Sequence, residues 1–323
     1  MTNAHIEFAG ITKSYGPTKI IGDTSVSIGE GEFVSLLGPS GSGKSTMLNM
    51  IAGLAFPSTG EVRARGEAVT GPGPDRGVVF QNHALLPWMT ARGNIEFGLR
   101  SARPELSKAE RTQIAQDFLD EVSLGHAADR RPSRLSGGMQ QRVGLARAFA
   151  IGSDILLLDE PFGALDALTR GVIQDELIKI WSATKQTVFM ITHDIDEAVK
   201  LGDWVVVFDE GAHIQQYDRP ERILAEPAND FVADFVGSGA GLKRLGLRSV
   251  DSLPLRPIAQ HPTGTLPGGP VLDAATPISE ALAVLVTAPA EEIAVVRDGT
   301  VIGLLDYPTL RAHARAGDEQ ARP

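Results

Sequence analysis

The sequence predicts an α/β core followed by a smaller α+β unit, on three observations. The short apolar runs Ile155–Leu158, Val188–Ile191 and Val205–Phe208 have the length of buried strands and are separated by helical segments, as in a parallel sheet covered on both faces. The apolar run Phe33–Leu37 leads into a glycine-rich loop and then a helical pattern. After residue 236 proline and glycine become frequent, which indicates a boundary before a second unit.

The start of the chain predicts an antiparallel flank to this core. Ile6–Ile11 and Ile20–Ile28 are strand-like runs with Gly16 and Pro17 as a turn between them. Further on, Ser107 and Glu110 have the spacing of a helix capping box. The apolar face that follows predicts a helical insertion; its members are Ile114, Phe118, Leu119 and Val122.

Composition narrows the classes of function. The 323 residues are 42% hydrophobic and 22% charged, a balance typical of soluble globular proteins. Thirty Lys and Arg stand against 40 Asp and Glu, a net charge of -10, so nucleic acid is not an expected partner. The absence of cysteine excludes disulfides and thiolate metal sites and agrees with a reducing cytoplasmic compartment.

No segment is expected to enter a membrane or direct secretion. Met1–Phe8 has no basic stretch followed by an apolar core, so no signal peptide is expected. The longest apolar runs are far shorter than the roughly 20 residues that a bilayer span requires. Any association with a membrane must therefore come through a partner.

The glycine-rich loop carries the first chemical motif. Gly38–Ser45 fits the pattern G-x-x-x-x-G-K-[ST] between a strand and a helix, the context in which backbone N–H groups cradle phosphates. Lys44 would reach the β- and γ-phosphates, and Ser45 would ligate Mg²⁺. The residues assigned to phosphate binding are Gly38, Pro39, Ser40, Gly41, Ser42, Gly43, Lys44, Ser45 and Thr46. Alone, the motif could be a glycine turn that binds nothing, and it does not separate kinases, GTPases, helicases and transporter ATPases.

Two acids end the strand Ile155–Leu158. Ligands lie at the carboxyl ends of strands in open α/β sheets, so Asp159 is expected to hold the magnesium shell. Glu160 would lie on the other side of the chain and polarise the attacking water. The alternative is that both acids simply end a buried strand in solvent.

The most discriminating stretch is Leu135–Arg142, with the sequence LSGGMQQR. Ser136 and two glycines at a helix start would present a hydroxyl and bare N–H groups to a phosphate, although a Ser-Gly-Gly helix cap is the plainer alternative. This stretch resembles the signature sequence of ABC-transporter ATPases, a P-loop NTPase family. The resemblance implies nucleotide contacts from Ser136, Gly137, Gly138 and Gln140.

The other elements of this family follow in the expected order, and the resemblance covers residues 1–236. Tyr15 resembles the aromatic residue that stacks on adenine, and Gln81 the glutamine that touches Mg²⁺ and senses the permease. Ala164–Asp166 resembles the loop that communicates across the dimer, and His193 the switch histidine at the γ-phosphate. Each residue also has an ordinary alternative. Tyr15 could be a surface aromatic and Gln81 a turn residue. Asp166 could be the N-cap of a helix over 167–181, and His193 a histidine at a strand end.

The resemblance also implies an assembly. The phosphate loop of one ATPase subunit and the signature of a second close on one ATP, so a head-to-tail dimer binds two nucleotides with Mg²⁺. A permease and, indirectly, a solute-binding protein are the further partners, and the chain is expected at the cytoplasmic face of the membrane. A separate ATPase chain without a span is the usual importer arrangement, although exporters of this kind exist. DNA-repair and translation ATPases of the family are less favoured, because the chain has neither a long coiled-coil insertion nor a second cassette.

The segment after Gln81 is the candidate permease contact. His83 and Leu85–Met89 form an apolar stretch expected in an exposed loop. Burial of the same stretch within the helical insertion is an equal alternative.

Two local resemblances disagree about the cargo. Gly71–Gln81 with Leu85–Trp88 resembles the ATPases of nitrate, taurine and aliphatic-sulfonate importers. Phe231–Leu247 resembles those of glycine betaine and quaternary-amine importers, which carry CBS domains. The first match is longer and lies within the core, so a small anion is the expected cargo and a quaternary amine the alternative.

The predicted organisation is an ABC ATPase domain over 1–236, a linker over 237–270 and a CBS-like unit over 271–323. Residues 271–310 resemble a single CBS unit, a helix followed by a hairpin that turns at Asp298 and Gly299. Since such units normally pair, the tail is expected to dimerise across the transporter. Residues 263–323 carry four arginines against eight acids, which disfavours a role in sensing anionic lipid. A passive packing remnant is the alternative.

Overall fold

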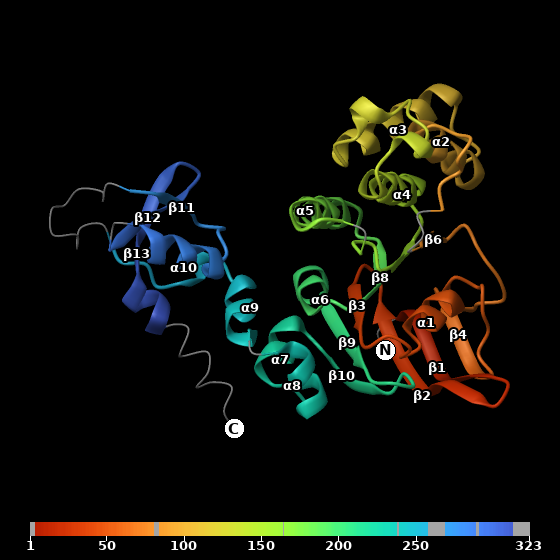
Figure 1. Ribbon diagram of the computed structural model, residues 1–323, viewed down its shortest axis with the longest axis horizontal. Coiled ribbons are helices and arrows are strands. Elements are labelled where there is room, and N and C mark those ends of the chain that lie inside the picture. The colour runs from red at the N-terminus through yellow and green to blue at the C-terminus, as the bar shows by residue number, and fades with distance from the viewer. Residues whose placement is uncertain are drawn as a thin grey trace. The chain divides into compact units, whose positions relative to one another are not determined.

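The computed structural model describes residues 4–80, 84–163, 165–237, 239–257, 269–288 and 291–312. It divides into two compact units, Met1–Asp218 and Arg219–Pro323 (Figure 1). This division falls before residue 236, so two short helices assigned to the first domain by sequence belong to the second unit.

A six-stranded sheet forms the centre of the first unit, in the order β10-β9-β3-β8-β7-β6. Every neighbouring pair is parallel except β9 and β10. The strands are β3 (Phe33–Leu37), β6 (Arg76–Val79), β7 (Ile155–Asp159), β8 (Thr187–Thr192), β9 (Trp204–Phe208) and β10 (Ile214–Asp218). Since β3 and β8 are buried along their whole length, their continuous apolar sequences are those of strands covered on both faces.

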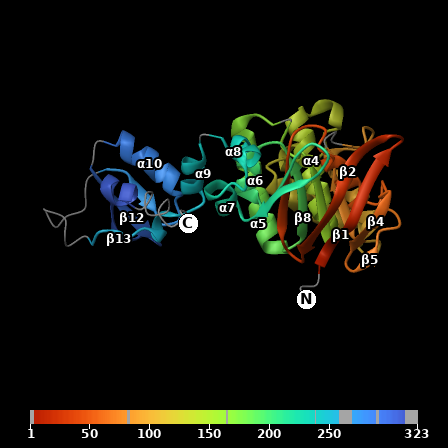
Figure 2. The same cartoon turned by 90° about the horizontal axis from the view of Figure 1, so that it is seen from below.

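A second, antiparallel sheet lies along one side of this unit (Figure 2), and it confirms the predicted flank. Its order is β2-β1-β4-β5. The strands are β1 (Ala4–Tyr15), β2 (Thr18–Gly29), β4 (Thr59–Ala64) and β5 (Glu67–Ala68). A turn at Gly16, whose φ is 59°, joins the first two.

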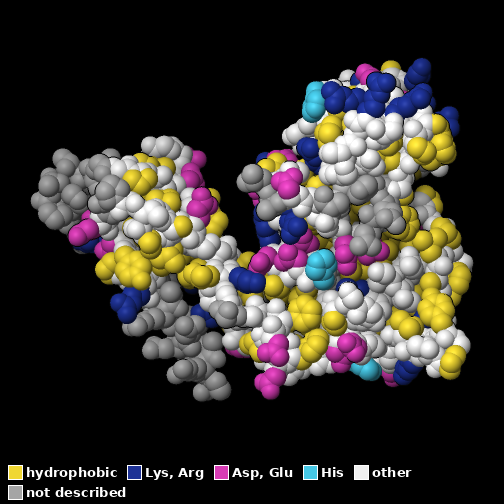
Figure 3. Space-filling model, in the orientation of Figure 1, with side chains coloured by type: hydrophobic (Ala, Val, Ile, Leu, Met, Phe, Trp, Pro, Cys, Tyr) yellow, Lys and Arg dark blue, Asp and Glu magenta, His cyan; other side chains and the backbone are white. Residues whose placement is uncertain are grey.

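The helical insertion forms a small bundle with a core of its own. Its helices are α2 (Ala91–Ala102), α3 (Lys108–Glu121) and α4 (Gly137–Ile151), with 3₁₀ turns at Gly125–Ala127 and Pro132–Arg134. The predicted capping box starts α3, because the Ser107 hydroxyl accepts from Glu110 N and Ser107 N donates to the Glu110 carboxylate. Figure 3 shows Lys and Arg side chains gathered at the outer end of this bundle.

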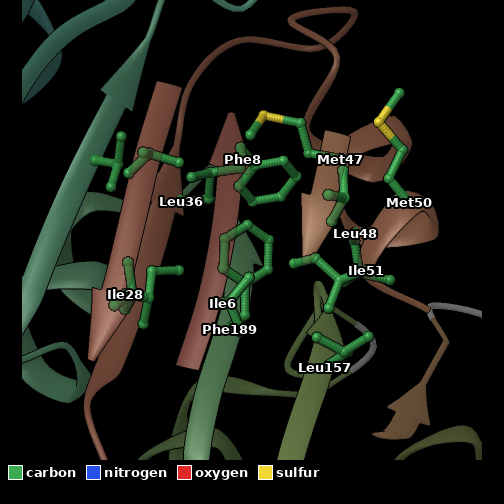
Figure 4. Packing of buried hydrophobic residues seen from close by; sticks show 14 of the residues in the cluster. Ile6, Phe8, Ile28, Leu36, Met47, Leu48, Met50, Ile51, Leu157 and Phe189 are labelled. Carbon is green, nitrogen blue, oxygen red and sulfur yellow. The ribbon is translucent and has the colours of Figure 1, made fainter. Parts of the chain in front are cut away.

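Two apolar clusters pack against opposite faces of the central sheet. One joins the sheet to the antiparallel flank and to α1 (Lys44–Ile51), where Phe8, Met47 and Phe189 are fully buried (Figure 4). The other joins it to α4 and α5 (Ala167–Thr184). Helix α6 (Ile195–Leu201) follows β8 and packs on β3. Loops at the carboxyl ends of β3, β7 and β8 are thereby held on a rigid support.

The second unit is built from short helices and a three-stranded sheet, in the order β11-β12-β13. Its elements are α7 (Pro220–Ala225), α8 (Asp230–Val236), α9 (Ala240–Gly246), a 3₁₀ turn at Val250–Ser252, β11 (Val271–Asp273), α10 (Ile278–Thr287), β12 (Glu292–Arg297) and β13 (Thr300–Asp306). The predicted helix and hairpin are present, and the hairpin turns at Asp298 and Gly299, both with positive φ. The segment predicted as a linker contains α9, because its prolines begin only at Pro254.

None of the helices within the described ranges is long and apolar enough to cross a membrane.

Candidate functional site

The glycine-rich loop connects β3 to α1 and allows no side chain at two of its positions. A Cβ on Gly38 would lie 2.7 Å from the Phe208 carbonyl oxygen, closer than van der Waals contact permits. Gly43 has a φ of 87° and precedes the first residue of α1, a conformation that residues with a side chain rarely adopt. The chain can therefore turn tightly into α1, whose first backbone N–H groups have no partner within the helix and can face an anion.

Lys44 is folded into this loop and is only 6% exposed. Its ammonium donates to the carbonyl oxygens of Gly38 and Pro39, each at 2.8 Å, and to Ser42 Oγ at 3.2 Å. Burial lowers the Lys44 pKa, and the carboxylates of Glu160 and Asp159 oppose this shift. A cation placed in this way can exchange backbone carbonyls for phosphate oxygens with little movement.

The loop forms one wall of a cavity of about 540 Å³. Glu160 and His193, from the ends of β7 and β8, line the same cavity. Its lining residues are Ile20, Ser40, Gly41, Ser42, Gly43, Lys44, Ser45, Thr46, Glu160 and His193. The structure thus brings the predicted phosphate loop close to Glu160 and His193. These residues are far apart in the sequence, and the parallel sheet places them side by side.

Asp159 lies beside the first turn of α1. Its Oδ1 accepts a hydrogen bond from Ser45 Oγ at 3.4 Å. Burial and the neighbouring Glu160 carboxylate raise the Asp159 pKa, whereas Ser45 and Lys44 lower it. The described residues contain no group of three or more His, Asp or Glu side chains that could hold a metal alone. A hydroxyl and a carboxylate fit Mg²⁺ instead, since this ion takes few protein oxygens together with phosphate oxygens and water.

Glu160 occupies an unusual backbone conformation, with a φ of 46°. Its N–H donates to the Ile191 carbonyl oxygen at 3.0 Å, which fixes the end of β7 against β8. The Glu160 Oε1 lies 3.5 Å from His193 Nδ1, and the two side chains are 25% and 63% exposed. A carboxylate and an imidazole thus face the cavity from adjacent strands, an arrangement that can orient and polarise a water molecule.

The signature residues form the start of α4 and lie outside the lining of this cavity. Ser136 is the N-cap, and its Oγ accepts from Met139 N at 3.3 Å. Gly137 is exposed beside it. Gly138 could not carry a side chain freely, because its Cβ would lie 3.0 Å from Leu165 Cδ2. Gln140 faces the protein, since its Nε2 donates to the carbonyl oxygens of Pro132 and Leu135.

Three other predicted site residues have different surroundings. Tyr15 is an exposed aromatic at the end of β1 with the Lys13 ammonium 4.7 Å from its ring centre, and it does not line the cavity. Asp166 caps α5 by accepting from Thr169 N at 3.0 Å. Gln81 lies outside the described residues, as do His83 and Ala164.

Sequence reasoning did not find Ile20 as part of the cavity wall. Ile20 belongs to an alternating strand pattern, and its contribution to the cavity depends on how β2 meets the loop at Gly43. A Cβ on Gly43 would lie 3.2 Å from the Ile20 carbonyl oxygen. No local sequence signal marks this approach.

Comparison with known proteins agrees with this geometry. Residues 21–163 match the family model described as ABC transporter. The bicarbonate transport ATP-binding protein CmpD of Synechocystis sp. is 42% identical over 253 residues, which are 73% of this chain and 90% of that protein. The nitrate import ATP-binding protein NrtD of Synechococcus elongatus is 50% identical over 222 residues, or 66% of this chain and 81% of that protein.

Solved structures give the same result. The dimeric post-hydrolysis state of the ATP-binding cassette MJ0796, bound to ADP and phosphate, is 35% identical with a TM-score of 0.61, covering 67% of this chain and 98% of that one. One conclusion follows from the phosphate loop, the two acids at the end of β7 and the match to 90% of the length of CmpD. This chain belongs to the ABC transporter ATP-binding proteins and is an ATPase of that family.

Proposed function

We propose that this chain is the ATPase subunit of an importer that couples ATP hydrolysis to uptake of a small anion through a separate permease. The observation that carries the hydrolytic part is the convergence of Lys44, Glu160 and His193 on one cavity. The similarity to proteins named for nitrate import and bicarbonate transport supports the anionic cargo. These two cargoes and the sulfonates share a small size and a negative charge.

Each residue of the cavity has a distinct proposed task. Lys44 binds the β- and γ-phosphates, and Ser45 and Asp159 would hold Mg²⁺, which when bound neutralises charge on the phosphate oxygens. Glu160 accepts a proton from the attacking water. His193 contacts the γ-phosphate beside it. Gln81 is proposed to join the Mg²⁺ shell and to sense the permease, as in the family.

A second copy of the chain is proposed to complete the site. Ser136, Gly137 and Gly138 do not line the cavity of their own chain, which agrees with a site to which a facing subunit supplies them. The dimeric MJ0796 cassette supports this arrangement. The γ-phosphate then gives ATP a higher affinity for the closed dimer than for the open one, and hydrolysis removes that difference.

The permease contact is proposed at the segment 85–89 and the groove beside it. Trp88 is 65% exposed, whereas Leu85 packs partly on the core of the helical bundle. A groove of about 330 Å³ lies next to this segment. Its lining residues are Met89, Thr90, Gly93, Glu96, Phe97, Arg100, Lys108 and Arg111. An exposed tryptophan beside such a groove suits a protein partner better than solvent.

The second unit keeps a quaternary-amine cargo as the alternative. Residues 271–312 contain the helix and hairpin for which a CBS-like unit was predicted, and we propose that this tail stabilises or inhibits the dimer. The deciding experiment reconstitutes the transporter in liposomes and measures ATPase activity with binding proteins loaded with either cargo. Stimulation by the nitrate- or sulfonate-loaded protein supports the proposal. Stimulation only by the betaine-loaded protein would replace the anion with a quaternary amine.

A truncation tests the tail separately. The full chain and a version that ends at Gly237 are compared in liposomes with anionic lipid across a salt series. We expect salt to affect both alike. Steep activation of the full chain alone would assign an osmotic sensor to the tail, since salt screens attraction to anionic lipid.

A further inference from the structure

Arg170, in the first turn of α5, connects two segments that carry proposed site residues. Its Nη2 donates to the carbonyl oxygen of Leu165 at 3.3 Å, directly before Asp166. Its Nη1 lies 3.4 Å from Asp194 Oδ2, directly after His193. Its Nε lies 3.7 Å from Glu197 Oε1 in α6. One planar guanidinium thus joins the loop proposed to face the second subunit to the loop proposed to contact the γ-phosphate.

The acidic end of this network is nearly enclosed. Glu197 is 6% exposed, and its Oε2 accepts from Thr192 Oγ1 at 2.7 Å. Thr192 Oγ1 in turn accepts from Asp194 N at 3.0 Å. The Glu197 carboxylate therefore holds Thr192 directly, and Asp194 through Thr192, on the two sides of His193. A buried carboxylate requires such partners, because leaving it without a cation or hydrogen bonds is costly.

The exposure of His193 explains why this support matters. With 63% of its side chain exposed and Glu160 Oε1 3.5 Å from its Nδ1, the ring has little packing around it, and its position depends strongly on the backbone that carries it. That backbone is held at Thr192 and at Asp194, which also caps α6 by accepting from Asp196 N at 2.8 Å. Arg170 does not line the nucleotide cavity, and its contacts reach His193 through these neighbours.

We propose that Arg170 is a positioning residue that links the placement of His193 to the segment 165–166. When a second subunit displaces that segment, the guanidinium passes the displacement to the turn that carries His193, and the imidazole reaches its working position. Dimer closure and hydrolysis are thereby linked inside one subunit. This inference rests on the proposed function, because it takes His193 to contact the γ-phosphate.

The first test compares Arg170→Met with the matched control Lys179→Met in the full chain. Lys179 is exposed on the same helix, and within the described part of the chain it pairs with Glu176, one turn away, at 2.8 Å. Since a misplacement of about 1 Å can cost about 100-fold in rate, Arg170→Met should lower kcat by about 10- to 100-fold. The KM for ATP should stay within about twofold. Lys179→Met should match the wild type in both constants.

A second variant separates positioning from charge compensation. If Arg170 served only to neutralise Glu197, the double variant Arg170→Met/Glu197→Gln would regain the wild-type kcat, because no buried charge would remain. We expect it to stay slow, since the links to Leu165 and Asp194 are still absent. Recovery of the wild-type rate would overturn the proposal. Thermal unfolding of each variant confirms that the comparison is made between folded proteins.

A double-mutant cycle tests whether Arg170 acts through His193. We expect the kcat of the double variant His193→Ala/Arg170→Met to lie within about twofold of the kcat of His193→Ala. If the two residues acted independently, their losses in kcat would multiply. Where His193→Ala has no measurable turnover, NMR decides. The His193 ring signal, identified by its loss in His193→Ala, should shift in Arg170→Met and stay fixed in Lys179→Met. An unshifted signal would refute the link.

The outcomes separate the inference from its premise. Wild-type turnover in His193→Ala would remove the proposed role of His193, and the inference with it. A slow His193→Ala together with a wild-type kcat in Arg170→Met would overturn only the role of Arg170.

Discussion

Replacement of Lys44 by alanine gives the sharpest test of the phosphate loop, because the structure shows what ATP must displace. The ammonium already donates to two backbone carbonyl oxygens at 2.8 Å. Nucleotide binding exchanges these neutral acceptors for anionic phosphate oxygens, so a hydrogen bond that is already charge-assisted on the donor side gains a charge–charge attraction. Taking about 1–1.5 kcal/mol for the charge added to each acceptor, two exchanged bonds gain about 2–3 kcal/mol, so Lys44→Ala should weaken ATP binding by about 30- to 150-fold.

Calorimetric titration measures this loss most directly. The Lys44→Ala variant and its parent both carry Glu160→Gln so that ATP is not consumed. Lys179→Ala, on the exposed face of α5, serves as the charge-matched control. Circular dichroism establishes that the loop variant is folded. An affinity for ATP within about threefold of the parent, a difference of well under 1 kcal/mol, would refute the assignment of Lys44.

Three further predictions concern the acids and the core. Glu160→Gln should lower kcat by about 10²- to 10⁴-fold, because the amide cannot accept a proton from water, and should accumulate as an ATP-bound dimer; elution of monomer alone with near-normal turnover would contradict this. Burial and Glu160 raise the Asp159 pKa, so on acidification Asp159 should be protonated, and Mg²⁺-dependent ATP binding lost, at a pH above the ordinary range of aspartate pKa values. Mg²⁺ titrations at a series of pH values measure this loss, and a midpoint of the loss within the ordinary range would contradict the prediction. Phe189→Ala, at a fully buried site beside Phe8, should destabilise the protein by about 3–5 kcal/mol in urea unfolding, and a loss below about 1 kcal/mol would mean that the cluster repacks.

The sequence predicted the central strands of the main sheet and not its edges. β3, β7, β8 and β9 are continuous apolar runs because both of their faces are covered. The edge strands β6 and β10 contain half-buried residues, and β10 carries two glutamines. Because β6 and β10 are buried on one side alone, no continuous apolar run marks them in the sequence.

The same limit applies to the site. The phosphate loop is local in sequence, so its residues could be named one by one from the motif, as could Asp159 and Glu160. The contacts of Arg170 with Asp194 and Glu197 span 24 and 27 positions. They exist only because α5 and α6 begin at neighbouring strand ends, which no spacing rule reveals. Gln140 was assigned to the nucleotide by motif membership alone, and its contacts with the carbonyl oxygens of Pro132 and Leu135, before α4, have no local sequence signal.

The backbone at Glu160 has a consequence for engineering this protein. Its φ of 46° lies where a residue with a Cβ is strained by about 1 kcal/mol or more and glycine is not. A selection for heat resistance would therefore favour glycine at position 160, and the resulting protein would fold and bind nucleotide without hydrolysing it. Any programme that raises the melting temperature of this ATPase should hold position 160 fixed, because the end of β7 gives up stability there to aim a carboxylate.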